Sequence, residues 1–448
     1  MMGRIFKAAA GVLAALLLIA GLAWLLSRQM RPSESELQAL ALVERTPARA
    51  GRNGFARLWA INRDVPEGHE AQLLERDVAR FNATPHPGMA GGDVDRRSLL
   101  EQYPELQANK AGAPAWCRWR EDDCLQRVSG DLAGYDALLA DHQRLLQRVA
   151  ALSDYDHFLS PYPPRLDMPI PAYPPLGLPL AAHALAFAQG HTDRALSGVC
   201  RDASLGRKII RSGDNLIGTM VGSAMVNGNA TLFADMLAEL PVDHPLPAAC
   251  AAAFAPLDTL AGDACGMMLG EGRYALGSTK SHVEAMRRDK WWTGLMLDPD
   301  KTAARMATRF AWYCGDAARQ RLAADLPLLD PGPATTPWSL SCASNAAGCI
   351  LSDIAAPAYE DYVARLQDVA ARLRALNVLL WMRGQDGTYD AETLDIVPPA
   401  LRAGPRAVRL DAEAGHLEVE LYERRQGLGE SWRVPLPASR IPAAASGD

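Results

Sequence analysis

The stretch DNLIGTMVGSAMVNGNATLFADML, residues 214–237, indicates the fold class most directly. Its apolar residues recur three and four positions apart, the spacing that places side chains on one face of an α-helix. The stripe consists of Leu216, Ile217, Met220, Val221 and Ala224, and it continues through Leu232, Met236, Leu237 and Leu240. Asn227-Gly228-Asn229 interrupts the pattern, so we expect either one kinked helix or two short ones.

The same helical spacing extends outward from this stretch in both directions. Residues 181–383 read as one helical domain, with a helix opening at Asp298-Pro299 and a last long helix from Tyr359 to Arg383. Residues 34–157 predict a first helical lobe, which begins with a short helix capped by Ser33 or Ser35. A chain of 448 residues with 49% hydrophobic and only 6% aromatic residues also favours helix over an all-β fold, and it excludes a disordered chain.

Two segments depart from the helical pattern. Residues 158–180 are rich in proline and predict an extended strap, either packed along the helical body or offered to an aromatic groove on a partner. Residues 384–448 contain three runs of alternating apolar residues and predict a small antiparallel β meander that packs on the last helix. These runs are Val408 and Leu410, then Leu417, Val419 and Leu421, then Trp432, Val434 and Leu436. The expected fold is therefore mainly α, with a small β ending.

An apolar run of twenty residues, AAAGVLAALLLIAGLAWLLS at 8–27, precedes the body. Twenty helical residues span about 30 Å, the hydrocarbon thickness of a bilayer. Arg4 and Lys7 favour a cytoplasmic amino-terminal tip, and Trp24 suits the opposite interface. We expect residues 1–33 to form this tip and an uncleaved transmembrane anchor in a bacterial inner membrane. A cleaved signal peptide is the alternative.

All eight cysteines follow the apolar run, and their number is even. This predicts disulfides and a large domain in the periplasm. The shared spacing C-x6-C pairs Cys117 with Cys124 and Cys342 with Cys349. Three connectivities remain for the other four, and we prefer Cys250–Cys265 with Cys200–Cys314. A zinc site is the competing interpretation, but the sequence has no C-x2-C pair.

Three short segments are candidate functional sites. Trp116, Arg118 and Trp119 lie on a loop that Cys117 and Cys124 would close, and rigid aromatic and arginine side chains are typical of binding surfaces. Trp291 and Trp292 form a second candidate binding surface, with burial in the core as the alternative.

The third candidate is the acidic cluster Asp154, Asp156 and His157. It predicts either acid–base or metal chemistry, or a polar helix end. No recognised catalytic motif occurs, so no catalytic residue or cofactor is assigned. The net charge of −6 gives no indication of a nucleic-acid partner.

Three stretches resemble uncharacterised bacterial envelope proteins with one amino-terminal anchor and a helical periplasmic domain. They are NGFARLWAINRDVPE at 53–67, the stretch at 214–237, and ILSDIAAPAYEDYVARLQDVAARLRALNVLL at 350–380. The resemblance implies a location and an architecture, and no activity. The order of a long helix, DGTYDAETLDIVPPAL at 386–401 and a meander also resembles the carboxy-terminal part of type II secretion pseudopilins, as a fold analogy only.

These features together predict a membrane-anchored, non-enzymatic binding or scaffold component that contacts another envelope protein. A helical hydrolase acting on peptidoglycan or glycan, with carboxylates such as Asp154 or Asp156, is one alternative. An immunity or inhibitor protein with an acidic surface is another.

Overall fold

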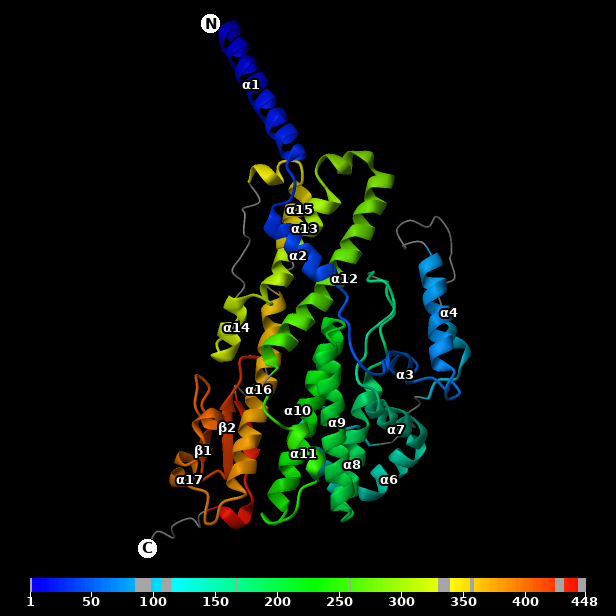
Figure 1. Ribbon diagram of the computed structural model, residues 1–448, viewed down its shortest axis with the longest axis vertical. Coiled ribbons are helices and arrows are strands. Elements are labelled where there is room, and N and C mark those ends of the chain that lie inside the picture. Colours follow the sequence, from blue (N-terminus) through cyan, green and yellow to red (C-terminus); the bar gives the residue numbers. More distant parts are fainter. Residues whose placement is uncertain are drawn as a thin grey trace.

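The computed structural model describes residues 2–84, 98–106, 114–165, 167–257, 259–328, 339–354, 358–423 and 431–441. It confirms a mainly helical chain with one apolar amino-terminal helix, four disulfides and a small three-stranded sheet near the carboxyl terminus. The body is elongated (Figure 1). Helix α1 projects from one end of it, and the sheet lies toward the other end.

Helix α1 (Met2–Gln29) is the one helix of the described chain that is long and apolar enough to cross a membrane. Its stretch Ile5–Gln29 has a mean hydropathy of 2.5, and its apolar side chains lie outside the body. After a short link, α2 (Glu34–Glu44) begins at Ser33, whose hydroxyl accepts a hydrogen bond from the Glu36 amide. The apolar run therefore forms a helix, and the expected cap of α2 at Ser33 is confirmed.

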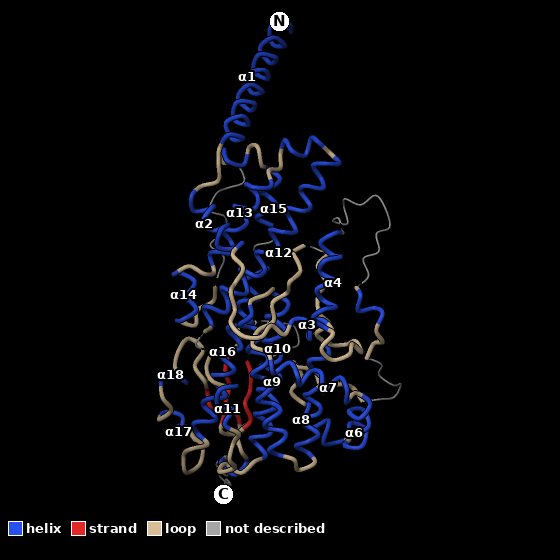
Figure 2. The backbone as a smooth tube through the Cα atoms, turned by 45° about the vertical axis from the view of Figure 1, so that its right-hand side comes forward, coloured by secondary structure: helices blue, strands red, loops and turns tan. Residues whose placement is uncertain are grey.

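The segment that follows α2 builds one side of the body (Figure 2). Its helices are α3 (Phe55–Trp59), α4 (Glu70–Ala83), α5 (Cys124–Gly130), α6 (Leu132–Asp141) and α7 (Gln143–Ala150). The chain turns at His142, between α6 and α7, and a ring nitrogen of His142 bonds the Leu138 carbonyl. Arg148 of α7 is buried and donates to the carbonyls of Ala60, Ile61 and Val65, which ties α7 to the α3 segment.

The centre of the body consists of long helices that pack on one another. They are α8 (Pro179–Ala188), α9 (Thr192–Ser212), α10 (Leu216–Glu239), α12 (Leu260–Asp289), α13 (Pro299–Trp312) and α16 (Ala358–Met382). Shorter helices flank them: α11 (Ala248–Ala253), α14 (Asp316–Ala323), α15 (Ala346–Ile354), α17 (Ala391–Asp395) and α18 (Pro399–Arg402). The largest buried apolar cluster joins α8, α9, α10 and α16 to the sheet.

Helix α10 runs without a break through Asn227-Gly228-Asn229, so the expectation of two short helices is wrong. Gly228 allows the backbone of another segment to approach α10 closely. A Cβ atom at Gly228 would lie 2.8 Å from the Cα atom of Trp119. Burial of the helix on several sides outweighs the cost of about 1 kcal/mol that a glycine brings to a helix interior.

The proline-rich segment crosses the body as an extended chain with one short turn, Pro174–Gly177. Tyr162 and Tyr173 are buried, and the Tyr162 hydroxyl donates to Asp77 at 3.0 Å. The carbonyl oxygen of Pro164 would lie 2.0 Å from a Cβ atom at Gly277, so the segment touches α12 where that helix has no side chain.

The sheet is an antiparallel meander of β1 (Arg409–Asp411), β2 (His416–Glu420) and β3 (Ser431–Pro435). Leu417 pairs with Val434 and Val419 with Trp432, and all four side chains are buried. This face packs on α16 and α10, as the alternating pattern predicts.

The disulfides confirm two expected pairs and correct the other two. Cys117–Cys124 and Cys342–Cys349 are bonded. The preferred pairs Cys250–Cys265 and Cys200–Cys314 are wrong, since the bonds are Cys200–Cys250 and Cys265–Cys314. The reason is helix packing: α11 lies along α9 and brings Cys250 to Cys200, while the end of α13 brings Cys314 to Cys265 on α12.

Candidate functional site

The loop closed by Cys117 and Cys124 projects from the body between two cavities. Both cysteines are buried, while the Arg118 side chain is 82% exposed. A turn shapes the loop, because the Arg118 amide donates to the Glu121 carboxylate and the Glu121 amide donates to the Arg118 carbonyl. The Arg127 guanidinium of α5 also bonds Glu121, at 2.6 Å. The loop is therefore held at its base and open at its tip.

Trp119 is the half-buried centre of this loop and lines both cavities. Its backbone lies against Gly228 of α10, and its ring lies near Gly177 in the proline-rich segment. Among the described residues, no hydrogen-bond partner reaches its buried indole N–H. A buried donor of this kind costs free energy unless a partner or water satisfies it.

The first cavity has a volume of about 510 Å³ and is mainly aromatic and apolar. Trp116 forms one wall, in an edge-to-face contact with His142 at 5.0 Å between ring centres. The remaining lining residues come from the loop and the proline-rich segment: Cys117, Arg118, Trp119, Pro174, Gly177 and Leu178. The structure thus brings the predicted residues Trp116, Arg118 and Trp119 to one place.

The second cavity, which we call the polar cleft, has a volume of about 440 Å³ and lies where α10, α16, the meander and the disulfide loop meet. Its charged lining residues are Arg120, Asp122, Asp235, Arg365, Asp368, Arg372, Glu423 and Arg433. Its other lining residues are Trp119, Met220, Ser223, Ala224, Asn227, Thr231, Leu421, Ser431 and Trp432. Both signs of charge and two indoles therefore meet in one concave surface.

Several of these charges have fixed structural partners. Asp368 accepts hydrogen bonds from Arg406 and from the amides of Tyr422 and Glu423, so it anchors the meander to α16. Arg365 pairs with Glu423 at 3.0 Å. The guanidinium of Arg372 lies 5.3 Å from the centre of the Trp432 ring, and burial lowers the pKa of Arg372.

Asp235 is the carboxyl group in the cleft with the most altered acidity. Burial, together with the smaller effects of the nearby carboxylates of Asp122 and Glu239, raises the pKa of Asp235 to about 7. A carboxyl group with this pKa can hold or release a proton near neutral pH. Asp235 interrupts the apolar pattern of the mostly buried helix α10, and this interruption is the sequence signal that would have identified it.

The sequence-predicted residues Asp154, Asp156 and His157 line neither of the two cavities described above. Asp154 and Asp156 are exposed, and the Asp156 carboxylate accepts from the backbone amide of Arg52 at 2.7 Å. His157 is buried, and its backbone forms a bridge with Asn53. The cluster joins two chain segments in the described structure. No group of three or more metal-ligating side chains occurs among the described residues.

Trp291 and Trp292 lie at the other end of the body, in the short turn Trp291–Leu295 between α12 and α13. Trp292 is 53% exposed, so the alternative of two buried indoles does not hold for it. The side chain of Trp291 lies outside the described side chains.

Sequence reasoning missed most of the polar cleft. Asp122, Asp235, Arg372 and Arg433 come from four elements, and up to 311 positions separate them in the chain. Local periodicity carries no information about such a meeting.

No family model, curated protein or solved structure matches the chain. The expected similarity to pseudopilins therefore finds no support among solved structures, and the fold is described on its own terms.

Proposed function

We propose that this protein is a single-anchor component of a bacterial inner membrane that holds a disulfide-bonded domain in the periplasm. The apolar α1 supports the anchor, and four disulfides are typical of an oxidising compartment. The basic residues Arg4 and Lys7 ahead of the span support a cytoplasmic amino terminus.

We propose further that the domain is a non-enzymatic binding component whose polar cleft takes a segment of another envelope protein. The observation that carries this proposal is the meeting of two indoles and both signs of charge in a cavity of about 440 Å³. Aromatic and arginine side chains supply most of the energy at protein interfaces. Two buried polar atoms beside the cavities have no partner among the described residues: the donor Trp119 Nε1 and the acceptor Asn227 Oδ1. A peptide segment offers both a carbonyl acceptor and an N–H donor to bond them.

Site-specific photo-crosslinking of the full chain in intact cells tests this proposal. A photoreactive residue replaces Arg433, which lines the cleft with a side chain that is 70% exposed. The control position is Ile396, which is 64% exposed on the surface outside the cleft. We expect a discrete crosslinked protein at 433 that is absent at 396 and that weakens in Trp119→Ala. Identical crosslinks at both positions contradict the proposal.

One observation favours a second candidate function, a hydrolase that acts on peptidoglycan or glycan. Asp235 with its raised pKa and Asp122 line the same cleft, and glycoside hydrolysis uses one protonated and one ionised carboxyl group. In this form of the proposal, Asp235 replaces Asp154 and Asp156 as the acid, because those two carboxylates are exposed outside the cleft.

The variant Asp235→Asn tests the acid in two ways. Turnover of peptidoglycan by the full chain should disappear in this variant if Asp235 is the general acid. Turnover equal to that of the native chain rejects Asp235 as the acid, and a native chain without turnover rejects the hydrolase. Independently, between pH about 4 and about 7 the native state keeps a proton that the unfolded state has released, so stability falls as pH rises through this window. Melting curves of Asp235→Asn should show a smaller decline than those of the native chain, because Asp214, whose pKa burial raises to about 6, still contributes. This difference tests the acidity of Asp235 whether or not the protein is an enzyme.

A further inference from the structure

The end of the body nearest α1 exposes several large apolar side chains close together in the fold. Trp292, Leu295 and Met296 are 53%, 42% and 52% exposed and lie in or next to the turn Trp291–Leu295. Leu340, in the turn Leu340–Cys342, is 47% exposed. The Trp24 indole bonds the Leu295 carbonyl and the Ser27 hydroxyl bonds the Ser341 carbonyl, so both turns lie at the end of α1 and belong to one surface. We call it the proximal face.

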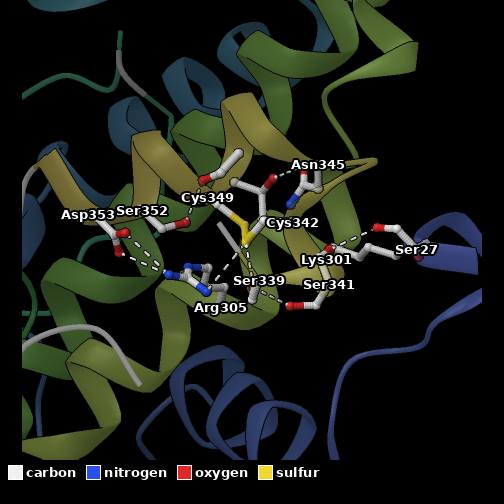
Figure 3. Close-up of a disulfide and its surroundings, with 12 residues drawn as sticks. Ser27, Lys301, Arg305, Ser339, Ser341, Cys342, Asn345, Cys349, Ser352 and Asp353 are labelled. Carbon is white, nitrogen blue, oxygen red and sulfur yellow. Dashed lines mark hydrogen bonds and ion pairs between the residues drawn. A yellow bond between two sulfur atoms is a disulfide. The ribbon is translucent and has the colours of Figure 1, made fainter. Parts of the chain in front are cut away.

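Hydrogen bonds fix the position of the proximal face relative to α1. The indole N–H of Trp24 donates to the Leu295 carbonyl at 2.7 Å. Three residues further along α1, the Ser27 hydroxyl bonds the Ser344 hydroxyl at 2.9 Å and accepts from the Ser344 amide at 2.9 Å. The Lys301 ammonium group of α13 donates to the Ser27 carbonyl at 2.7 Å (Figure 3). The end of α1 is thus part of the body.

The length of α1 then determines where the proximal face lies relative to the hydrocarbon layer of the membrane. The apolar run 8–27 contains twenty residues, which span about 30 Å as a helix, the thickness of the hydrocarbon layer, and Trp24 lies within one turn of the end of this run. Trp24 consequently lies at the boundary between hydrocarbon and headgroups, where tryptophan is enriched. Because Leu295 is hydrogen-bonded to Trp24, the turn that carries Trp292 and Leu295 lies at the same depth. Figure 1 shows the ends of α12 and α15 at the end of the body from which α1 emerges.

Basic side chains accompany these apolar groups. The Arg28 guanidinium lies 5.0 Å from the centre of the Trp24 ring, and the Lys290 ammonium group lies 6.0 Å from that of Trp292. Arg28, Lys290 and Arg31 are exposed. Indoles flanked by exposed cations match a membrane interface with anionic phospholipids, where the rings sit among headgroups and the cations meet phosphate groups.

We propose that the proximal face rests on the lipid surface of the membrane that α1 spans, with Trp292, Leu295 and Met296 among the headgroups and Arg28 and Lys290 against anionic phosphates. The proposal depends on α1 as a membrane span and not on any ligand of the polar cleft. Two membrane contacts, one crossing and one lying on the surface, hold the body in one orientation, with the meander directed away from the bilayer.

A fluorescence experiment on the full chain tests this contact. All eight native cysteines form disulfides, so an introduced cysteine is the single free thiol for a fluorescent label. Met296→Cys reports on the proximal face. Ile396→Cys, 64% exposed on the distal part of the body, is the matched control, and Leu18→Cys within α1 reports on the span itself. Each labelled chain is reconstituted into vesicles of phosphatidylcholine and phosphatidylglycerol that contain brominated lipid as a quencher.

We expect brominated lipid to quench the labels at 18 and 296 and to leave the label at 396 unchanged. Quenching at 18 without quenching at 296 overturns the lipid contact and leaves the span intact. A lack of quenching at both 18 and 296 overturns the span as well. If the label at 296 is shielded from aqueous iodide but not quenched by lipid, another protein or a second copy covers the face, and the lipid proposal is wrong.

A substitution within the face provides the second measurement. Leu295→Glu, made in the Met296→Cys chain, adds a negative charge while it keeps the backbone carbonyl that Trp24 bonds. We expect this variant to lose lipid quenching at 296 while a label at 18 stays quenched. Vesicles of phosphatidylcholine alone lack the negative charge that attracts basic side chains, an attraction worth about fivefold in membrane affinity per residue. We therefore expect weaker quenching at 296 in these vesicles. Unchanged quenching in both tests overturns the proposal.

Discussion

The two short disulfide loops have the same spacing and opposite surroundings. Cys117–Cys124 and Cys342–Cys349 each close a separation of seven residues. The first loop extends outward beside the polar cleft, whereas the second is packed between α13 and the end of α1 (Figure 3). The chain entropy that a disulfide removes depends on loop length, so the covalent contribution is the same in both. The difference comes from the six residues enclosed.

Those enclosed residues explain the two surroundings. The first loop encloses RWREDD, whose charged side chains need water, and the second encloses ASNAAG, whose small side chains allow close packing. In the second loop, buried Asn345 accepts from the Asp298 amide at 2.7 Å and from the Thr302 hydroxyl at 3.1 Å. The Cβ atom of an alanine at Gly348 would lie only 2.0 Å from that hydroxyl. The same disulfide spacing therefore occurs in an exposed loop and in a buried contact between the second loop, α13 and the end of α1, which we call the buried joint.

The largest effect on stability is expected when each disulfide is removed in turn, and the two removals also test how the loops differ. Cys117→Ala/Cys124→Ala and Cys342→Ala/Cys349→Ala should each lower the free energy of unfolding by about 2–3 kcal/mol, the entropy of an eight-residue loop. Urea denaturation measures this loss. Only the second variant should speed tryptic cleavage at Arg28, because only that loop holds the end of α1. Equal acceleration in both variants would show that the loops are not distinct.

A smaller effect is expected where the exposed loop meets α10. Gly228→Ala places a methyl group 2.8 Å from the Cα atom of Trp119, and such overpacking costs about 1–3 kcal/mol. The gain in helix propensity of about 1 kcal/mol offsets part of this cost. Gly262→Ala on α12 is the matched control, since nothing lies within 4 Å of the new Cβ atom, and it should stabilise the protein. Thermal melts that move in the same direction for both would contradict this contact.

The buried joint should respond to a single hydroxyl. Ser27→Ala leaves the Ser344 amide without its acceptor and should cost about 1 kcal/mol. The control Ser281→Ala removes a hydroxyl that bonds the Gly277 carbonyl of its own helix, and it should change stability by less than about 0.5 kcal/mol. Hydrogen exchange at Ser344 provides the local measurement. Exchange that stays slow in Ser27→Ala would mean that α1 does not hold this joint.

The smallest effect is expected at the exposed tip of the first loop. Arg118→Ala removes a side chain that is 82% exposed, so stability should change by less than about 0.5 kcal/mol. The melting temperature should equal that of the native chain within error. A loss as large as that of Gly228→Ala would show that the tip is packed.

Local signals predicted local structure well. The apolar run predicted α1, Ser33 with Glu36 predicted the cap of α2, and strict alternation predicted the meander. The C-x6-C spacing predicted both short disulfides because neighbouring cysteines need little else to meet. The enclosed sequences RWREDD and ASNAAG also carried the information on burial.

Long-range structure depended on helix packing that no local pattern carries. Cys200 and Cys250 meet because α11 lies along α9, and the sequence specifies only their separation of 50 residues. The polar cleft has the same origin, since Asp122, Asp235 and Arg433 come together only when three parts of the chain are in place. Asp154 and Asp156 showed the opposite case. They lie two positions apart in the sequence, yet Asp156 joins two segments by accepting from the Arg52 amide, and neither acid lines the polar cleft.

The order of the disulfides has a consequence for biogenesis. Each cysteine is bonded to its immediate neighbour in the series of eight, so the four closed loops follow one another without overlap. A chain that crosses a membrane from its amino terminus presents the two members of each pair before the next pair emerges. An oxidant that joins cysteines in order of appearance therefore makes the native set directly. In the proposed periplasmic location, oxidative folding of this protein should depend on a thiol oxidase and be indifferent to a disulfide isomerase.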